Sequence, residues 1–347
     1  MYIYISFLLM SFLNILISLI DKRFEKYMTF FLSINLIIFF GLRYNVGVDY
    51  NLYYETISNI SGYEFERLEP AFKIIAIISH YLSPHLTFIL GSTIYTLALF
   101  KFNIKYSPWP SLSFLLFLSF PFLLLSSLNL IRQFIAISII LFSIDYLINR
   151  KFIHYFLSII IASLFHKSAL ILLFIYFFIM STKLTIFVAL SFMLAIKILL
   201  DFLVSINALP HIYIVGFEDK NIEISKVILL SSVILFYFII FRLTHKIKRY
   251  RIEMVSYNMI ILSLIFYITP KIYNISEELF IRFTFYFNQF LPLLIVYSIE
   301  RIKILSDKLI VYLITIVLLF LSIFYYIYTL YFKGIEYNLI PYNWILG

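Results

Sequence analysis

The feature of this sequence that most constrains its fold is a series of long apolar stretches separated by short polar segments. A helix that crosses a bilayer needs about 20 predominantly apolar residues, because the hydrocarbon core is about 30 Å thick. The stretches that approach this length predict spans at 2–20, 27–42, 86–101, 109–128, 130–148, 151–165, 168–181, 184–204, 225–243, 253–269, 282–299 and 308–331. The sequence therefore predicts an all-α, polytopic membrane helix bundle of about 12 transmembrane helices, organised as a single transmembrane domain over residues 1–347.

Composition excludes several other classes of protein. The chain is 63% hydrophobic and 13% charged, whereas a soluble domain has about 45–50% apolar and about 25% charged residues. A globular cytosolic enzyme, a disordered protein and a disulfide-stapled secreted domain are therefore excluded. Cysteine is absent, which excludes a thiolate metal site and a cysteine nucleophile.

The basic residues predict how the chain lies in the membrane. In membrane proteins, Lys and Arg concentrate in the cytoplasmic loops. We therefore interpret the net charge of +9 as a signal of orientation in the membrane, and we predict no nucleic-acid partner. The clusters expected in the cytoplasm are 21–26, 149–151, 242–251 and 300–303, together with Lys101, Lys105 and Lys183. This orientation places 16 of the 27 basic residues inside and 12 of the 18 acidic residues outside.

One apolar piece, residues 71–82, is too short to span and is followed at once by Ser83-Pro84-His85. The orientation above requires residues 71–101 to cross the membrane once. Residues 71–82 are therefore predicted to form a re-entrant or interfacial half-helix, with both chain termini outside. No basic residue precedes the first span, as expected for an external N-terminus without a cleaved signal peptide.

The predicted external side carries most of the polar sequence. It receives the loops 43–70, 205–224 and 270–281 and the tail 332–347. The cytoplasmic loops are short and contain no Gly-rich phosphate loop, which excludes ATP-driven transport by this chain and a soluble domain that uses nucleotide sugars. No internal repeat indicates an inverted-repeat transporter.

Two segments of the external side carry candidate ligand-binding residues. Arg43 ends the second span, and its fork of donors suits a phosphate or carboxylate; Asp49 could orient it or act as a base. The alternative is an interfacial arginine paired with a loop acid. Asn129, Arg132 and Gln133 open a later span. A charge inside the apolar region is costly, so Arg132 and Gln133 are expected to face a polar cavity or an anion, unless Arg132 reaches the headgroups.

Two further segments complete the set of candidates. His166 lies in a tight turn between apolar runs and could be a base, a phosphate ligand or a cap. It has no second ligand at metal spacing, so we predict neither a metal nor a cofactor; Ser168 lacks a nucleophile motif. Arg282 opens a span after two acids, with Tyr286 one turn later. Together these residues predict a cationic external pocket for a lipid-linked diphosphate.

These residues resemble the EpsG-like and Wzy-type polysaccharide polymerases of bacterial envelopes. The matching pieces, in order along the chain, are Arg43, Gly47 and Asp49 with Tyr53, Glu69-Pro70, Arg132-Gln133 with Ala136, His166 and Ser168, Arg282 with Tyr286, and Pro341-Tyr342. Each piece is short, so the specificity lies in the ordered combination. The resemblance covers nearly the whole chain.

The resemblance implies an enzyme of the bacterial cytoplasmic membrane with an outward-facing active site. It would transfer a growing glycan from one undecaprenyl diphosphate carrier to a repeat unit on a second carrier, and a chain-length regulator could be a partner. Arg132 and Arg282, with Arg43, would stabilise the leaving diphosphate. The base would be Asp49, Glu69 or His166, and Asp49 is favoured because a carboxylate beside an arginine stays ionised at neutral pH. The remaining candidates for substrate binding are Tyr53, Asn129, Gln133 and Tyr286.

Three rival functions remain from the sequence. An O-antigen ligase uses the same carrier but usually has a larger external loop late in the chain, whereas the longest loop here is 43–70. A flippase for lipid-linked oligosaccharides should have charges in mid-membrane, where only Lys73 and Lys197 are ambiguous. A membrane O-acetyltransferase would need a histidine that faces the cytoplasm, and His166 is predicted outside.

Overall fold

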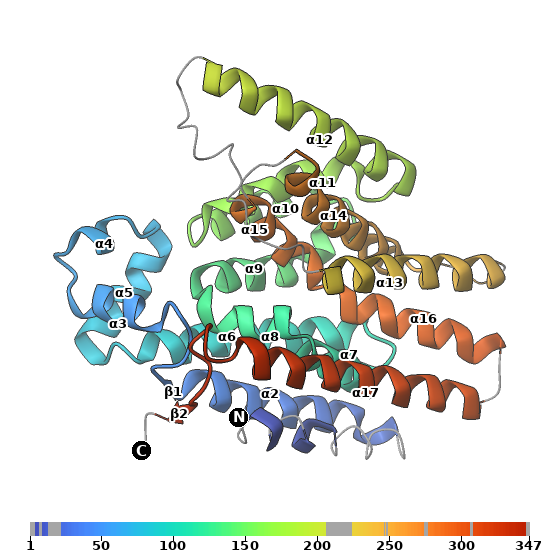
Figure 1. The fold of residues 1–347 in the computed structure, drawn as a ribbon, viewed down its shortest axis with the longest axis horizontal. Helices are drawn as coiled ribbons and strands as arrows, with labels where there is room; N and C mark the ends of the chain where they lie inside the picture. Colours follow the sequence, from blue (N-terminus) through green and yellow to red (C-terminus); the bar gives the residue numbers. More distant parts are fainter. Residues whose placement is uncertain are drawn as a thin grey trace. The chain divides into compact units, whose positions relative to one another are not determined.

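The computed structural model describes residues 4–6, 9–12, 22–205, 224–245, 247, 249–273, 277–305 and 308–344. The chain divides into two compact units, which we describe separately: unit 1 consists of Met1–Leu170 and Asp307–Gly347, and unit 2 of Ile171–Ser306. Helices make up nearly all of the regular structure (Figure 1). The predicted all-α class is confirmed.

Unit 1 is built around three helices that pack side by side. The central helix α6 (Leu86–Tyr106) lies between α2 (Glu25–Gly41) and α9 (Ile131–Ile148). The other elements of unit 1 are η1 (Lys22–Phe24), α3 (Tyr50–Ser58), α4 (Tyr63–Glu66), α5 (Pro70–Leu82), α7 (Pro110–Ser119), α8 (Pro121–Asn129), α10 (Phe152–Ser163), α17 (Lys308–Lys333), and the strands β1 (Arg43–Tyr44) and β2 (Asn343–Trp344). Helix α10 packs on α9, and α17 packs on α7.

The C-terminal segment of unit 1 returns to the start of the 43–70 loop. Strand β2 pairs antiparallel with β1, with Arg43 opposite Trp344 (Figure 1). The ring of Tyr342 is buried and stacks on Phe39 at 4.7 Å between centroids, and the Tyr4 hydroxyl donates to the carbonyl of Leu339 at 2.8 Å. The tail therefore packs on protein and fixes the backbone that follows α2.

Unit 2 is organised around one long helix, α14 (Arg251–Tyr273), which packs against α12, α13, α15 and α16. The other elements are α11 (Leu172–Phe178), α12 (Thr182–Ser205), α13 (Ile224–Leu243), α15 (Glu278–Asn288) and α16 (Leu291–Leu305); the short helix η2 (Lys167–Ile171) leads into this unit. A buried ion pair joins two of these helices, with Arg301 Nη2 at 2.9 Å from Glu253 Oε2.

Six helical segments among the described residues are long and apolar enough to cross a membrane, or up to seven if one bent pair forms a single span. The six are Leu86–Tyr106, Ile131–Ile148, Lys226–Leu243, Arg251–Tyr273, Phe280–Ile304 and Leu313–Lys333. The chain is therefore a multi-pass membrane protein. The predicted number of about 12 spans is not reached in the part of the chain that the structure describes.

Breaks in the helices account for part of this difference. The predicted span 109–128 is two helices, α7 and α8, bent by 70°, because Pro121 lacks an N–H donor and disfavours helical geometry at Phe120. The predicted spans 151–165 and 168–181 contain α10 of 12 residues and α11 of 7 residues. At 1.5 Å per residue, both are much shorter than the bilayer core of about 30 Å.

Some of the remaining predicted segments coincide with described helices, and others lie outside the described residues. The predicted half-helix 71–82 is a separate helix, α5, and its re-entry into the membrane stays a prediction. The predicted span 27–42 coincides with α2, and 184–204 with α12, of which Thr182–Ile196 belongs to the shorter apolar helices. Most of the span 2–20, the loop 206–223, and parts of 270–281 and 332–347 lie outside the described residues.

Candidate active site

Four of the predicted site residues meet in unit 1 from four different segments. Tyr53 lies on α3, and Glu69 immediately precedes Pro70, the first residue of α5. Arg132 lies in the first turn of α9, and His166 follows α10. We call these four residues the charged cluster. They span 113 positions of the sequence, so only the packing of the helices brings them together.

Arg132 connects the cluster through two hydrogen bonds. Its Nη1 donates to Glu69 Oε2 at 2.6 Å, and its Nε donates to the Tyr53 hydroxyl at 3.1 Å. The guanidinium also lies over the Tyr53 ring, 5.8 Å from the centroid. The third nitrogen, Nη2, has no hydrogen bond to any described residue, and 28% of the Arg132 side chain is exposed. The bound part of the fork is therefore fixed while Nη2 can reach a ligand.

His166 lies against the other oxygen of the same carboxylate. Its Nδ1 is 3.4 Å from Glu69 Oε1, an ion-pair distance without hydrogen-bond geometry. His166 is buried, and neither ring nitrogen has a hydrogen-bond partner among the described residues. The adjacent backbone is held by a bond from Ala71 N to Leu164 O at 3.0 Å. The Nδ1 side of the imidazole therefore faces Glu69 at ion-pair distance, and the buried Nε2 has no partner among the described residues.

The electrostatics of the cluster favour an ionised Glu69. Burial by itself opposes ionisation, but the contact with His166 and the charge of Arg132 outweigh it and lower the pKa of Glu69 to about 2. Burial raises the pKa of the Tyr53 hydroxyl, although Arg132 acts in the opposite direction. At neutral pH, Tyr53 is therefore a neutral group that accepts from Arg132.

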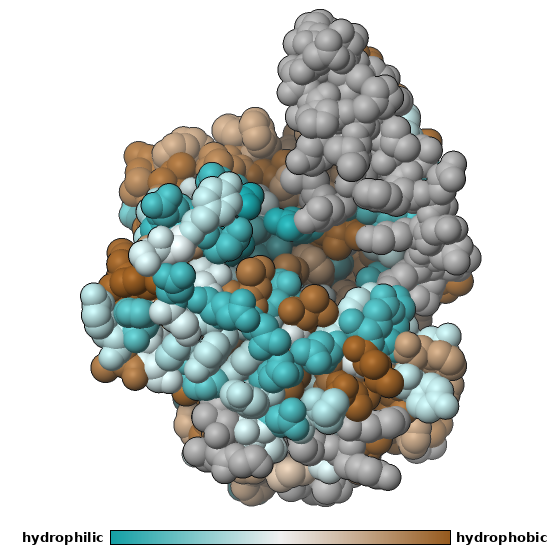
Figure 2. Space-filling view, turned by 60° about the vertical axis from the view of Figure 1, so that its left-hand side comes forward, coloured by the Kyte–Doolittle hydropathy of each residue, from teal (hydrophilic) through white to brown (hydrophobic). Residues whose placement is uncertain are grey.

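An apolar layer holds the cluster in place. Tyr53 itself belongs to a buried group that includes Ile57, Phe72, Phe88 and Ile131. This packing anchors the helices that carry the charged cluster. A reactive group needs such support to be positioned precisely. The face turned forward in Figure 2, which includes α3, α4 and α5, is rich in polar side chains.

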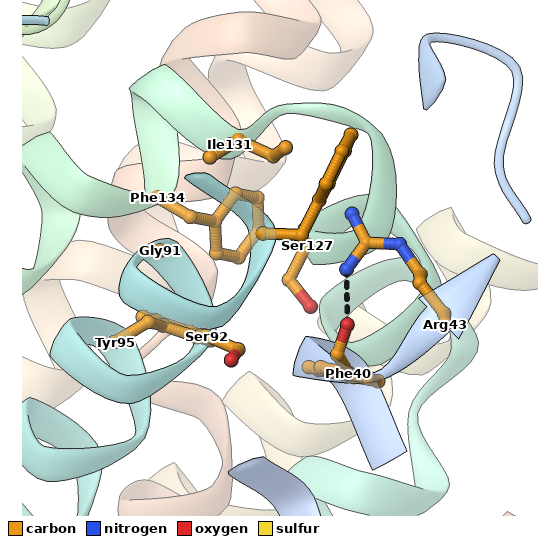
Figure 3. Close-up of a pocket in the computed structure, with 9 residues that line it drawn as sticks. Phe40, Arg43, Gly91, Ser92, Tyr95, Ser127, Ile131 and Phe134 are labelled. Atoms are coloured by element: carbon orange, nitrogen blue, oxygen red, sulfur yellow. Dashed lines mark hydrogen bonds between the residues drawn. The ribbon is translucent and has the colours of Figure 1, made fainter. Parts of the chain in front are cut away.

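Arg43 is placed differently from the expectation of an exposed ligand-binding arginine. It is 2% exposed, and its donors go to the backbone carbonyls of Val46 at 3.2 Å, Leu128 at 2.7 Å and Phe40 (Figure 3). Burial lowers the pKa of Arg43 to about 10, so it remains charged at neutral pH. Its guanidinium joins the end of α2 to the end of α8.

The cavity beside Arg43 is small. Its volume is about 10 Å³, enough for about one water molecule. The lining residues are Phe40, Arg43, Phe88, Gly91, Ser92, Tyr95, Ser127, Ile131 and Phe134 (Figure 3). Sites for larger ligands usually have about 300–1,000 Å³. This cavity therefore cannot hold a diphosphate or a sugar as it stands.

Asn129 lies next to the sharp turn of the 43–70 loop. Gly47 has a φ of +102°, and a Cβ at this position would lie 2.5 Å from Asn129 Oδ1. The Gly47 N–H donates to the carbonyl of Asn338 at 2.7 Å. Asn129 therefore packs against a backbone that only glycine can adopt without strain.

The other predicted residues have distinct positions. Asp49 is half-buried at the start of α3 and contributes to the raised pKa of Tyr53, and Gln133 is 1% exposed beside Arg132. Arg282 and Tyr286 lie on α15 of unit 2, where Tyr286 is buried. Their role in substrate binding stays a prediction.

One polar contact near this site was not predicted from the sequence. The Tyr50 hydroxyl and His85 Nδ1 are 2.8 Å apart. The available signal was the spacing of Tyr50, Tyr53 and Tyr54, which places three rings within about one helical turn. Among the described residues, no group of three or more His, Asp or Glu is arranged to hold a metal ion.

Comparison with known proteins supplies the family. No curated protein and no solved structure matches the chain. The EpsG family matches residues 26–344, which include the charged cluster, Arg43 and Arg282. The match covers more than nine-tenths of the sequence and bears out the resemblance carried by the motifs. The chain therefore belongs to the EpsG family, which is implicated in exopolysaccharide biosynthesis.

Proposed function

We propose that this protein is a membrane glycosyltransferase that polymerises a lipid-linked glycan. It transfers the growing glycan from one undecaprenyl diphosphate carrier to a repeat unit on a second carrier, at the outer face of the bacterial cytoplasmic membrane. The observation that supports this best is the convergence of Glu69, Arg132 and His166 in one cluster. It combines a fixed cation with an oriented base, the two groups that this transfer needs.

In the proposed reaction, a new glycosidic bond forms as the bond between the anomeric carbon and the diphosphate breaks. The bonding electrons leave with the diphosphate, so negative charge grows on its oxygens. Arg132 Nη2 donates a charge-assisted hydrogen bond to that charge. The bonds to Glu69 and Tyr53 hold the guanidinium plane in place before the substrate arrives.

The acceptor sugar loses a hydroxyl proton in this step. We assign His166 as the base, because its buried Nε2 has no partner among the described residues and its Nδ1 lies 3.4 Å from Glu69 Oε1. Glu69 also stabilises the imidazolium that forms, as the carboxylate does in other oriented histidine pairs. A carboxylate with a pKa of about 2 is itself a weak base, so Glu69 acts as the positioning residue. Arg43, with its donors on three carbonyls, serves as scaffold.

The test is deletion of the gene in its host, followed by gel analysis of surface polysaccharide. Complementation uses the wild type, Glu69→Gln, and the matched control Glu64→Gln. The carboxylate of Glu64 is half exposed, and among the described residues it pairs with exposed Arg67. Membrane levels of each tagged variant are measured in parallel. We expect the deletion and Glu69→Gln to reduce the ladder to a single repeat unit that still reaches the surface, and Glu64→Gln to restore the full ladder.

Other outcomes would contradict the proposal. Loss of all surface glycan, with lipid-linked repeat units trapped on the cytoplasmic side, would indicate a flippase. Long polymer that accumulates on the lipid carrier would indicate a ligase. A full ladder from Glu69→Gln at normal membrane levels would show that the charged cluster takes no part in the reaction.

A further inference from the structure

The tyrosines of helix α3 contact two different groups of residues. Tyr53 contacts Arg132 of the charged cluster. Tyr50 and Tyr54, one turn apart on the same helix, contact His85 at the start of α6: the Tyr50 hydroxyl is 2.8 Å from His85 Nδ1, and the Tyr54 and His85 rings are 5.0 Å apart. A group of aromatic rings thus lies directly beside the proposed site of reaction.

These rings are ordered by contacts with the buried interior. Arg43 lies 4.9 Å above the Phe88 ring, and Phe88 stacks on Tyr50 at 4.4 Å with an interplanar angle of 12°. Tyr50 and Tyr54 are nearly parallel, at 6.3 Å and 12°. This series of contacts begins at a fully buried cation and ends at Tyr54, which is only partly buried. Tyr54 is therefore held by its neighbours while part of it stays accessible.

The edge of this group is open and polar. Tyr44, on the tail-anchored strand β1, is 47% exposed, and its ring lies 5.7 Å from His85. His85 is partly exposed, and its Nε2 has no hydrogen bond to any described residue. A lipid tail would gain nothing from such polar groups. A sugar fits them, because its C–H face packs on an aromatic ring while its hydroxyls need hydrogen-bond partners.

We propose that Tyr44, Tyr54 and His85 form a subsite for a sugar residue of the lipid-linked glycan. The sugar packs its C–H face on Tyr54 and directs a hydroxyl toward His85. Because Tyr53 and Tyr54 are consecutive, one substrate can occupy this subsite and reach Arg132. The inference rests on the proposed function only in taking a glycan as the substrate.

The experiment measures binding without turnover. Full-length protein in nanodiscs is titrated with oligosaccharides of one to three repeat units, released by mild acid from the polysaccharide of its host, and the Kd is measured by nuclear magnetic resonance saturation transfer. The variants are Tyr54→Ala, Tyr54→Phe, which keeps the ring, and Tyr44→Ala. The matched control is Tyr63→Ala in the same loop, because Tyr63 is 71% exposed and lies outside the ring group.

We expect Tyr54→Ala to raise the Kd by about three- to tenfold, the range for loss of one aromatic contact. Tyr54→Phe and Tyr63→Ala should bind like the wild type. Tyr44→Ala tests the same subsite from its exposed edge if Tyr54→Ala does not fold. Wild-type affinity in both alanine variants, equal weakening in Tyr63→Ala, or no binding by the wild type would overturn the inference.

A further variant separates this inference from the proposed function. Arg132→Gln should abolish polymer formation but retain most oligosaccharide binding. If polymer forms normally in Arg132→Gln while Tyr54→Ala still weakens binding, the proposed function fails and the sugar subsite stands. If the wild type binds no oligosaccharide while Arg132→Gln abolishes polymer, the subsite fails and the proposed function stands.

Discussion

Arg132 Nη1 donates to Glu69 Oε2 at 2.6 Å although the two residues are 63 positions apart. One lies at the start of α9 and the other just before α5, so the bond joins two helix N-termini. The carboxylate also contacts His166. A single side chain, Glu69, therefore sets the geometry of both the cation and the histidine.

The first prediction concerns the shape of the cation at position 132. Arg132→Lys keeps a positive charge, but its three donors lie on one nitrogen and cannot reproduce the planar fork that bonds Glu69 and Tyr53 through two nitrogens and presents the third. We expect the rate of polymer formation to fall by about 10²–10³, the usual effect of removing one preorganised donor. The measurement is ladder length and polymer yield at matched membrane levels. The control Arg67→Gln, which changes an exposed arginine, should leave ladder length and polymer yield unchanged. A full ladder from Arg132→Lys would show that the fork geometry is not required.

The second prediction separates the candidate bases. His166→Gln should lower kcat in a reconstituted assay by about 10²–10⁴, the range for loss of general base catalysis, with little change in KM. Asp49→Asn should have a much smaller effect, because Asp49 acts on Tyr53 through its charge, whereas His166 lies directly against Glu69. The opposite ranking of the two variants would assign the base to Asp49.

The third prediction is a pH dependence of stability. The pKa of Glu69 is lowered from 4.5 to about 2, so its ionised form stabilises the fold above about pH 4.5. This contribution, roughly 3 kcal/mol at 1.36 kcal/mol per pH unit, is lost as the pH falls through about 2. Thermal unfolding in detergent should show a smaller decrease in Tm between pH 5 and 2 for Glu69→Gln than for the wild type. Parallel decreases would contradict the assigned ion pair.

The fourth prediction concerns the buried arginine of the scaffold. Arg43→Met leaves three carbonyls without their donor, and unsatisfied buried groups cost about 1–3 kcal/mol each. We expect a lower Tm and less folded protein, with polymer yield falling in proportion to folded protein. If the yield per folded molecule instead fell about 100-fold, Arg43 would act on the substrate, a loss comparable to that of an oxyanion donor.

The fifth prediction tests the turn at position 47. Gly47→Ala forces a side chain into a backbone with φ of +102° and toward Asn129 Oδ1. We expect a loss of about 1–3 kcal/mol of stability, the cost of such strained backbone, seen as a lower Tm. Adding Asn129→Ala to Gly47→Ala should recover only the part of the lost stability that comes from the contact between the new Cβ and Asn129. Full recovery would show that backbone conformation is not limiting.

Sequence and structure contributed different parts of the site. Arg132 was predicted from the cost of a charge at the edge of a span, and His166 from its place in a tight turn between apolar runs. Glu69 was predicted from its place in an ordered set of motifs. The sequence could not show that these three contact one another, because that depends on how α5, α9 and α10 pack. It also could not show that Arg43 is buried and bonded to backbone carbonyls, since a buried arginine and an interfacial arginine have the same local sequence.

The spans show the same division. The length of the apolar stretches determined that this is a multi-pass membrane protein, because such long apolar helices have few other stable environments. It did not determine where helices break: the 70° bend at Pro121 and the short helices on either side of His166 depend on tertiary packing of the freed backbone. The sequence by itself determined the class of protein, the family motifs and the candidate residues. The tertiary structure alone decided which of those residues meet, because contacts across 63 to 113 positions arise from helix packing and not from local spacing.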